Sequence, residues 1–125
     1  MKTEHWKEEP DEKDYPAAVN YLSLKTDPRE AKEIVKTMKR SSRIEHFMAK
    51  DIFRASGLPH LAADDHQVEK DLAKVKSGEK LSPVLLVRGT PLWVADGYHR
   101  ICASYHLNED EMIPCRIVDR ISATR

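Results

Sequence analysis

A glycine turn between an apolar hairpin and a helical pattern restricts most strongly how this chain can fold. The sequence Ala95-Asp96-Gly97-Tyr98-His99-Arg100 follows two apolar runs, Pro83–Val87 and Leu92–Ala95, which a short turn separates. A helical pattern, Ile101–Leu107, comes directly after it. The chain must therefore pass from a strand into a helix at Gly97. Because the first N–H groups of a helix lack internal partners and carry the positive end of its dipole, this turn predicts an anion site.

The side chains around the turn allow two interpretations. His99 and Arg100 fall in the first turn of the expected helix, where they could close around a phosphate. Alternatively, Asp96 simply caps the helix in a tight turn, His99 lies on the surface, and Arg100 pairs with Asp96 or Glu109. The two interpretations differ in whether His99 and Arg100 converge on one pocket.

Composition excludes several classes of protein. At 125 residues we expect one domain with a modest core. Lysine plus arginine and aspartate plus glutamate both number 21, which argues against binding duplex DNA by bulk charge. No apolar run approaches the ~20 residues needed to span a bilayer. The segment Met1–Trp6 lacks the apolar core of a secretion signal, so we expect no membrane association and a cytoplasmic location.

The cysteines and histidines show no pattern of a metal site. Cys102 and Cys115 do not belong to a CxxC pair, and the histidines are not spaced as co-ligands. We expect both cysteines to be small buried thiols. His60, His66 and His106 have no neighbours that suggest catalysis, and we expect them to face solvent.

The first half of the chain is expected to be mostly helical. Residues 1–14 are acidic and polar and predict a solvated arm, which Trp6 could attach to the body of the domain. A short helix is expected at Tyr15–Leu24. The sequence Asp27-Pro28-Arg29-Glu30 then combines an N-cap, a proline at the first helical position and a glutamate three residues after the cap. It predicts a helix to about Lys39, with one apolar face made of Ala31, Ile34, Val35 and Met38.

The second half predicts alternating helices and strands. The run Pro83–Val87 is apolar on both faces, which is typical of a central buried strand. The other expected elements, in chain order, are a strand at Ile44–Met48, helical turns at Lys50–Ser56, a helix from Asp64 or Asp65 to Gly78, and a last strand at Ile113–Val118.

Four pieces of sequence occur in an order that points to a known family. They are the helix Val68–Lys76, the segment Gly78–Val84, the turn Asp96-Gly97-Tyr98-His99-Arg100, and His106-Leu107 followed by Ile113–Val118. In this order they resemble the ParB/sulfiredoxin-like superfamily. The resemblance implies an α+β fold with a small mixed sheet and packed helices. Residues 44–120 would form this core, and residues 1–43 would be an acidic arm and N-terminal helices that extend the same domain.

The resemblance also implies a nucleotide site. In members of this superfamily the glycine turn and its His-Arg pair hold the phosphates of ATP or CTP. Carried over to this chain, Gly97, His99 and Arg100 would hold phosphates, with the backbone amides of Tyr98 and His99 as donors.

Two further residues follow from the same resemblance. Asp96 matches an acidic residue of related turns, and it would either orient Arg100 or hold a magnesium ion. Ser82 belongs to the segment that passes beside the nucleotide. The expected cofactor is therefore ATP or CTP with magnesium.

Departures from the family pattern leave catalysis open. Sulfiredoxins have their catalytic cysteine where this chain has Tyr98, and Cys102 would lie about one helical turn deeper, so sulfinic-acid reduction is not expected. Centromere-binding ParB proteins have a helix-turn-helix domain after the nucleotide domain, and this sequence has only about seven residues after the last expected strand, so a centromere-binding ParB is not expected. The free-serine kinases have a similar turn and an upstream catalytic glutamate. Here the corresponding stretch Leu58–Asp65 contains aspartates and no glutamate.

Two functions remain after sequence analysis. The first is a nucleotide-binding domain, with or without phosphotransfer or hydrolysis, in which His99 and Arg100 determine affinity. The second is a non-catalytic binding or regulatory module, which contacts a protein partner, a second copy of the chain or, with weaker support, nucleic acid. Its contact surface would be the N-terminal helices or a basic face made of Lys32, Lys36, Lys39, Arg40 and Arg43.

Overall fold

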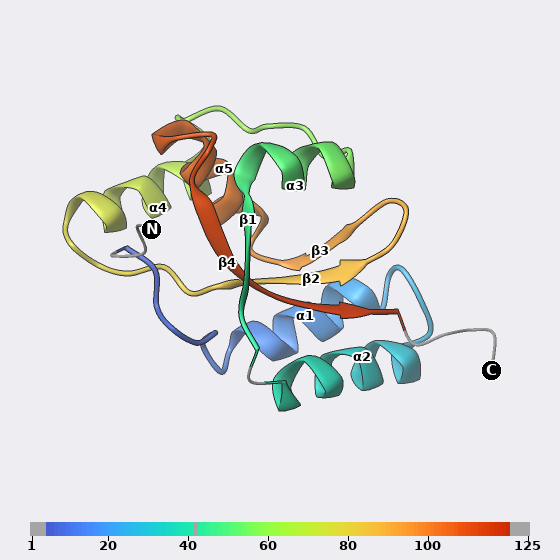
Figure 1. The fold of residues 1–125 in the computed structure, drawn as a ribbon. Coiled ribbons are helices and arrows are strands. Elements are labelled where there is room, and N and C mark those ends of the chain that lie inside the picture. The colour runs from blue at the N-terminus through green and yellow to red at the C-terminus, as the bar shows by residue number, and fades with distance from the viewer. Residues whose placement is uncertain (1–4, 42, 121–125) are drawn as a thin grey trace.

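The computed structural model describes residues 5–41 and 43–120, which fold around one four-stranded mixed sheet (Figure 1). The strand order is β1-β4-β2-β3. The elements in chain order are α1 (Asp14–Leu22), α2 (Pro28–Arg40), β1 (Glu45–Met48), α3 (Ala49–Ser56), α4 (His66–Lys76), β2 (Val84–Arg88), β3 (Trp93–Asp96), α5 (Tyr98–Leu107) and β4 (Met112–Asp119). The α+β class expected from the sequence is therefore confirmed.

The two inner strands of the sheet, β2 and β4, run parallel to each other. The edge strands β1 and β3 pair antiparallel with β4 and β2, respectively. Val84–Val87 is buried on both faces, as its uninterrupted apolar sequence predicted for a central strand. In the β2–β3 hairpin Leu85 pairs with Asp96, so the residues just before β2 lie beside the end of β3 and the start of α5.

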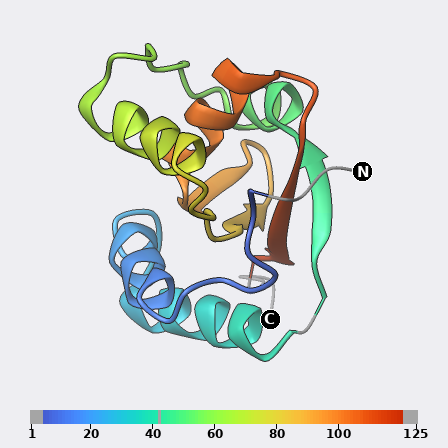
Figure 2. The same cartoon turned by 90° about the vertical axis from the view of Figure 1, so that its left-hand side faces the viewer.

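Helices cover both faces of the sheet (Figures 1 and 2). On one face α1 and α2 pack against alternate strand residues that include Leu85, Val87 and Trp93. On the other face α3, α4 and α5 pack against Val84, Leu86 and the neighbouring strands. Because successive strand residues point to opposite faces, the apolar run at β2 supplies both cores.

The helix boundaries follow local signals in the sequence. The Asp27 side chain accepts from the backbone N–H of Arg29 at 2.7 Å, and Asp65 caps α4 in the same way through Gln67 and Val68. Gly57 ends α3 in the left-handed region, with φ 72°. Several boundaries differ from prediction by one residue, and two differ by more: α1 ends at Leu22 rather than Leu24, and α5 begins at Tyr98 rather than at Ile101.

The segment before α1 is attached to the domain by Trp6. This side chain is 2% exposed, and its Nε1 donates to Glu111 at 3.4 Å. The backbone on either side of Trp6 forms hydrogen bonds with Leu81. The Lys7 N–H donates to the Leu81 carbonyl at 2.7 Å, and the His5 carbonyl accepts from the Leu81 N–H at 2.9 Å. Attachment by Trp6 is confirmed, but a fully solvated arm is wrong, because Asp14 at its end is buried.

Other predictions about single residues hold. Cys102 and Cys115 are buried and unpaired, and burial raises the pKa of both thiols. His60, His66 and His106 are exposed. Among the residues that the structure describes, no helix has the length and apolar character needed to cross a membrane.

Candidate functional site

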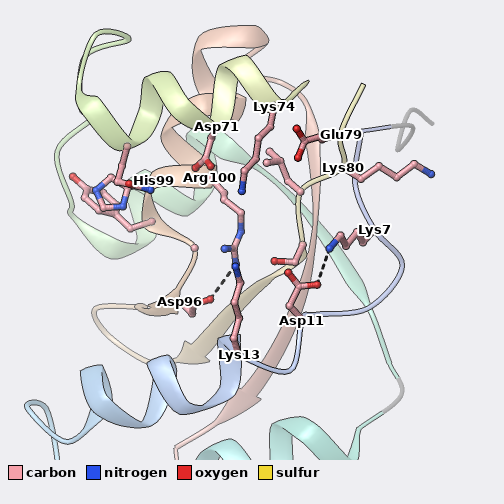
Figure 3. A pocket seen from close by; sticks show the side chains of 15 residues that line it. Lys7, Asp11, Lys13, Asp71, Lys74, Glu79, Lys80, Asp96, His99 and Arg100 are labelled. Atoms are coloured by element: carbon pink, nitrogen blue, oxygen red, sulfur yellow. Dashed lines mark hydrogen bonds and ion pairs between the residues drawn. The ribbon is translucent and has the colours of Figure 1, made fainter. Parts of the chain in front are cut away.

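Three separate parts of the chain enclose a polar cavity of about 360 Å³ (Figure 3). The attached N-terminal segment forms one wall. Helix α4 and the loop after it form a second wall, and the start of α5 forms a third. The lining residues are Lys7, Asp11 and Lys13; Gln67, Asp71, Lys74 and Glu79 to Ser82; and Asp96 to Arg100. All six residues that the sequence singled out, Asp96 to Arg100 and Ser82, therefore line one cavity.

Gly97 makes the sharp step from β3 into α5. Its φ is 108°, in the region that glycine alone adopts readily. A Cβ atom here would lie 2.5 Å from Val84 Cγ1 and 3.0 Å from an Arg100 nitrogen. The absence of a side chain therefore lets the first turn of α5 pack directly against β2 and the Arg100 guanidinium.

The first backbone N–H groups of α5 are left without acceptors among the described residues. Gly97 is the N-cap and has no side chain to cap with, and the first helical bond runs from Ile101 N–H to its carbonyl at 2.9 Å. The N–H groups of Tyr98, His99 and Arg100 precede that bond. The start of α5 therefore offers the uncapped donors that an anion requires.

Arg100 is held in place by contacts with three segments of the chain. Its guanidinium donates to Asp96 Oδ2 at 3.1 Å and to the Pro83 carbonyl at 3.2 Å, and Asp14 Oδ2 lies 3.7 Å away. The side chain is 16% exposed, so these pairs are shielded from solvent. The expected pairing of Arg100 with Asp96 is confirmed; pairing with Glu109 is not among the ion pairs of the described residues.

Ser82 contacts a carboxylate at the edge of the cavity. Its hydroxyl donates to Asp14 Oδ2 at 2.7 Å, and the Asp11 N–H donates to the same oxygen at 3.1 Å. Asp14 is therefore fixed where it faces Arg100. Ser82 lines the cavity as expected, and its hydroxyl positions Asp14.

Asp96 is the most strongly perturbed acid at the site. Burial raises its pKa from 3.8 to about 6; the Arg100 cation acts in the opposite direction, and the Asp14 carboxylate adds to the rise. The two carboxylates and the guanidinium form a compact, partly buried cluster. Asp96 therefore carries a proton in the folded protein at pH values where the unfolded chain has lost it.

We expect the substitution Asp96→Asn to change how stability depends on pH. A raised native pKa means that the folded state binds more protons than the unfolded state between about pH 4 and pH 6, so ionisation of Asp96 destabilises the wild type as pH rises through this range. Relative to wild type, Asp96→Asn should gain roughly 2 kcal/mol over that window, allowing for the group's partial exposure. Urea unfolding at pH 4, 5, 6 and 7 measures this, and parallel curves for the two proteins would contradict it.

Tyr98 and His99 lie at the cavity in different ways. The Tyr98 hydroxyl donates to the Pro59 carbonyl at 2.6 Å, so its side chain fixes the loop before α4 and leaves its backbone N–H for the site. His99 lines the cavity and packs on the Tyr98 ring, with centroids 5.3 Å apart. Figure 3 shows its ring at the side of the cavity, away from the pair of Asp96 and Arg100. His99 and Arg100 therefore share the cavity without pointing at one spot.

Several lining residues were not anticipated from the sequence. Lys13 points into the cavity from the N-terminal segment, and Lys74 points into it from α4, with Arg100 between them (Figure 3). Neither lysine forms an ion pair with any residue that the structure describes, whereas Lys7 pairs with Asp11 at 2.8 Å. Three cationic side chains from three segments therefore meet here, and two of them form no ion pair with a described residue.

A second, mainly apolar cavity of about 460 Å³ lies against the same turn. Ala17 and Tyr21 of α1, Leu58 and Val94 line it, together with residues 95–99. The start of α5 therefore separates a polar cavity from an apolar one.

The basic face of α2, which the sequence offered as an alternative contact surface, is exposed, and part of its charge is compensated, since Lys39 pairs with Glu12 at 3.0 Å.

The site has no ready-made metal centre. Within residues 5–41 and 43–120, no group of three or more histidine, cysteine or acidic side chains could hold a metal ion. Asp96, the expected magnesium ligand, directs Oδ2 to Arg100.

Comparisons with protein-family models, with curated proteins and with solved structures gave no match to this chain.

Proposed function

We propose that the polar cavity binds the phosphate groups of a nucleotide, ATP or CTP. The observation that supports this best is the convergence of uncapped α5 amides with Lys13, Lys74 and Arg100 in one cavity. Backbone N–H groups at a helix start bind phosphate oxygens, and cations around them neutralise the charge. The resemblance of residues 44–118 to the ParB/sulfiredoxin-like superfamily points to the same turn and the same ligand class.

Each group would have a separate part in binding. The amides of Tyr98 and His99 would donate to one phosphate, with Gly97 allowing its close approach. Arg100, oriented by Asp96 and Asp14, would present its remaining donors from the floor of the cavity. Lys13 and Lys74 would contact further phosphates from opposite walls.

Magnesium would enter this cavity together with the phosphates. The ion is commonly held by substrate phosphates plus one or two carboxylates and waters, so a site without a protein-only cluster is compatible with it. Binding is the proposed function; hydrolysis or phosphotransfer needs a base and an acceptor, and we assign neither.

The lysines test this proposal without disturbing the buried cluster. We expect Lys13→Ala and Lys74→Ala each to weaken ATP binding by roughly five- to tenfold, the loss of one charged contact at a partly solvated site. Lys80→Ala is the matched control, because Lys80 belongs to the same lining but points away from the cavity in Figure 3. Calorimetric titration of ATP with magnesium measures all three variants. Equal effects of the three lysines would point to general surface charge and against this site.

A further inference from the structure

Asp71 is a buried carboxyl group that the phosphate site does not need. It lies in the middle of α4, is 6% exposed, and lines the polar cavity. Figure 3 shows its carboxyl group pointing from α4 into the cavity on the side of Arg100. Among the residues that the structure describes, none donates a hydrogen bond to it or forms an ion pair with it.

This position is unfavourable for an aspartate on physical grounds. Aspartate is a poor residue for a helix interior, and burial of most of the Asp71 side chain imposes a desolvation cost on a carboxylate whose oxygens are open only to the cavity. Burial accordingly raises the pKa of Asp71, while the cations of Arg100 and Lys74 act in the opposite direction. An apolar side chain or an asparagine would suit the unliganded fold better, so the carboxyl group needs another explanation.

The neighbours of Asp71 on α4 suggest what that explanation is. Gln67 precedes it by four residues and Lys74 follows it by three, so all three side chains share one face of the helix, and all three line the cavity. The wall therefore runs from an amide through a carboxylate to an ammonium group. Phosphates would be repelled by Asp71 and attracted by Lys74, which leaves the Asp71 end for a part of the ligand that donates hydrogen bonds.

We propose that Asp71 accepts a hydrogen bond from the organic part of the nucleotide, either a sugar hydroxyl or the exocyclic amine of the base, and so selects nucleotides over simple phosphates. This inference rests on the proposed function, because it assigns the other end of the same ligand. Asp71 would orient the nucleotide, with the phosphates at α5, Lys13 and Lys74.

The test compares ATP with tripolyphosphate, which has phosphates and no donor groups. We expect wild type to bind ATP more tightly, and Asp71→Asn to weaken ATP binding roughly 10- to 100-fold, as for lost hydrogen bonds to a charged acceptor. Affinity for tripolyphosphate should stay unchanged or rise, because a repelling charge is removed. Asp64→Asn, an exposed aspartate outside the cavity lining, is the control.

Two ligand analogues identify the donor. If a sugar hydroxyl donates, 2′,3′-dideoxy-ATP loses affinity for wild type but not for Asp71→Asn. If the exocyclic amine of the base donates, the triphosphate of purine riboside, which lacks that amine, loses affinity for wild type but not for Asp71→Asn. If neither analogue shows a loss that depends on Asp71, the assignment is overturned.

Stability separates this role from a structural one. Removing a buried, unpartnered charge should leave the melting temperature of the unliganded protein unchanged or raise it, whereas a structural aspartate would lower it. The inference fails alone if wild type binds ATP and Asp71→Asn binds it equally well, or loses ATP and tripolyphosphate in equal proportion. If wild type binds neither ligand, the proposed function fails with it.

Discussion

Gly97→Ala should destabilise the protein by about 3–4 kcal/mol, the largest effect expected from removing or adding a single methyl-sized group near the site. Two costs add here. A left-handed φ costs an alanine ~1–2 kcal/mol. The new Cβ would also lie 2.5 Å and 2.8 Å from side-chain atoms of Val84, which is fully buried, so β2 or α5 must move. Forced shifts of this kind in a packed core cost ~1–3 kcal/mol.

Gly57→Ala provides the matched control for this substitution. Gly57 also has a positive φ, 72°, but a Cβ there would meet nothing within 4 Å. Gly57→Ala should therefore lower the free energy of unfolding only by the cost of a left-handed φ in alanine, ~1–2 kcal/mol. Urea unfolding of both variants measures the difference. Equal destabilisation would show that the contact with Val84 relaxes freely, and that close packing at the glycine turn does not fix the start of α5.

Arg100→Ala should abolish measurable ATP binding, with a loss of roughly 100-fold or more in affinity. Two losses combine: charged hydrogen bonds to phosphate, worth ~1.5–3 kcal/mol, and the cation that compensates Asp14 and Asp96. Without that cation the buried carboxylate of Asp14 faces the partly buried carboxylate of Asp96, and the protein should also lose stability. Calorimetric titration and thermal unfolding of the same samples measure both effects.

Arg100→Lys separates binding from stability. It keeps a positive charge beside Asp14 and Asp96 but loses the fork that can contact a carboxylate and a phosphate together. We expect a folded protein with roughly tenfold weaker ATP binding. Arg54→Ala is the control. Arg54 forms an exposed ion pair with Asp51 at 3.2 Å and does not belong to the cavity lining. Full ATP affinity in a folded Arg100→Ala would remove Arg100 from the site.

Local signals in the sequence predicted the framework of the fold well. The caps at Asp27 and Asp65, the proline at position 28 and the uninterrupted apolar runs of the hairpin act within a few residues, so their effects are visible in one segment at a time. The same holds for the glycine turn. Gly97 followed by His99 and Arg100 is a contiguous pattern, and the structure places all of it at one cavity.

Long-range contacts decided the rest of the site. Nothing in the N-terminal sequence indicates that Trp6 pairs beside Leu81, and this contact brings Asp14 to Ser82 and Lys13 into the cavity. The prediction of a solvated arm failed for that reason. The polar stripe of Gln67, Asp71 and Lys74 had a visible signal, their spacing on one helix face, but the sequence alone does not show which face meets a cavity.

The second cavity also reaches the start of α5 and Asp96. It is lined by residues 95–99 together with Ala17 and Tyr21 of α1 and is mainly apolar, so a group held there would contact the start of α5 without contacting Lys74. Asp96 lines both cavities, and its raised pKa, about 6, is in the range suited to proton exchange near neutral pH. Turnover assays belong after binding has been measured.

Calorimetric titration of the wild-type protein with ATP and with CTP, each with magnesium, tests the central claim most directly. We expect saturable binding of one nucleotide per chain, displacement of that nucleotide by tripolyphosphate, and weaker binding in added salt, because salt screens phosphate contacts with cations. The absence of binding of either nucleotide at millimolar concentration, by a protein that unfolds cooperatively, would contradict it. The exposed basic face of α2 would then be the next surface to test for partners.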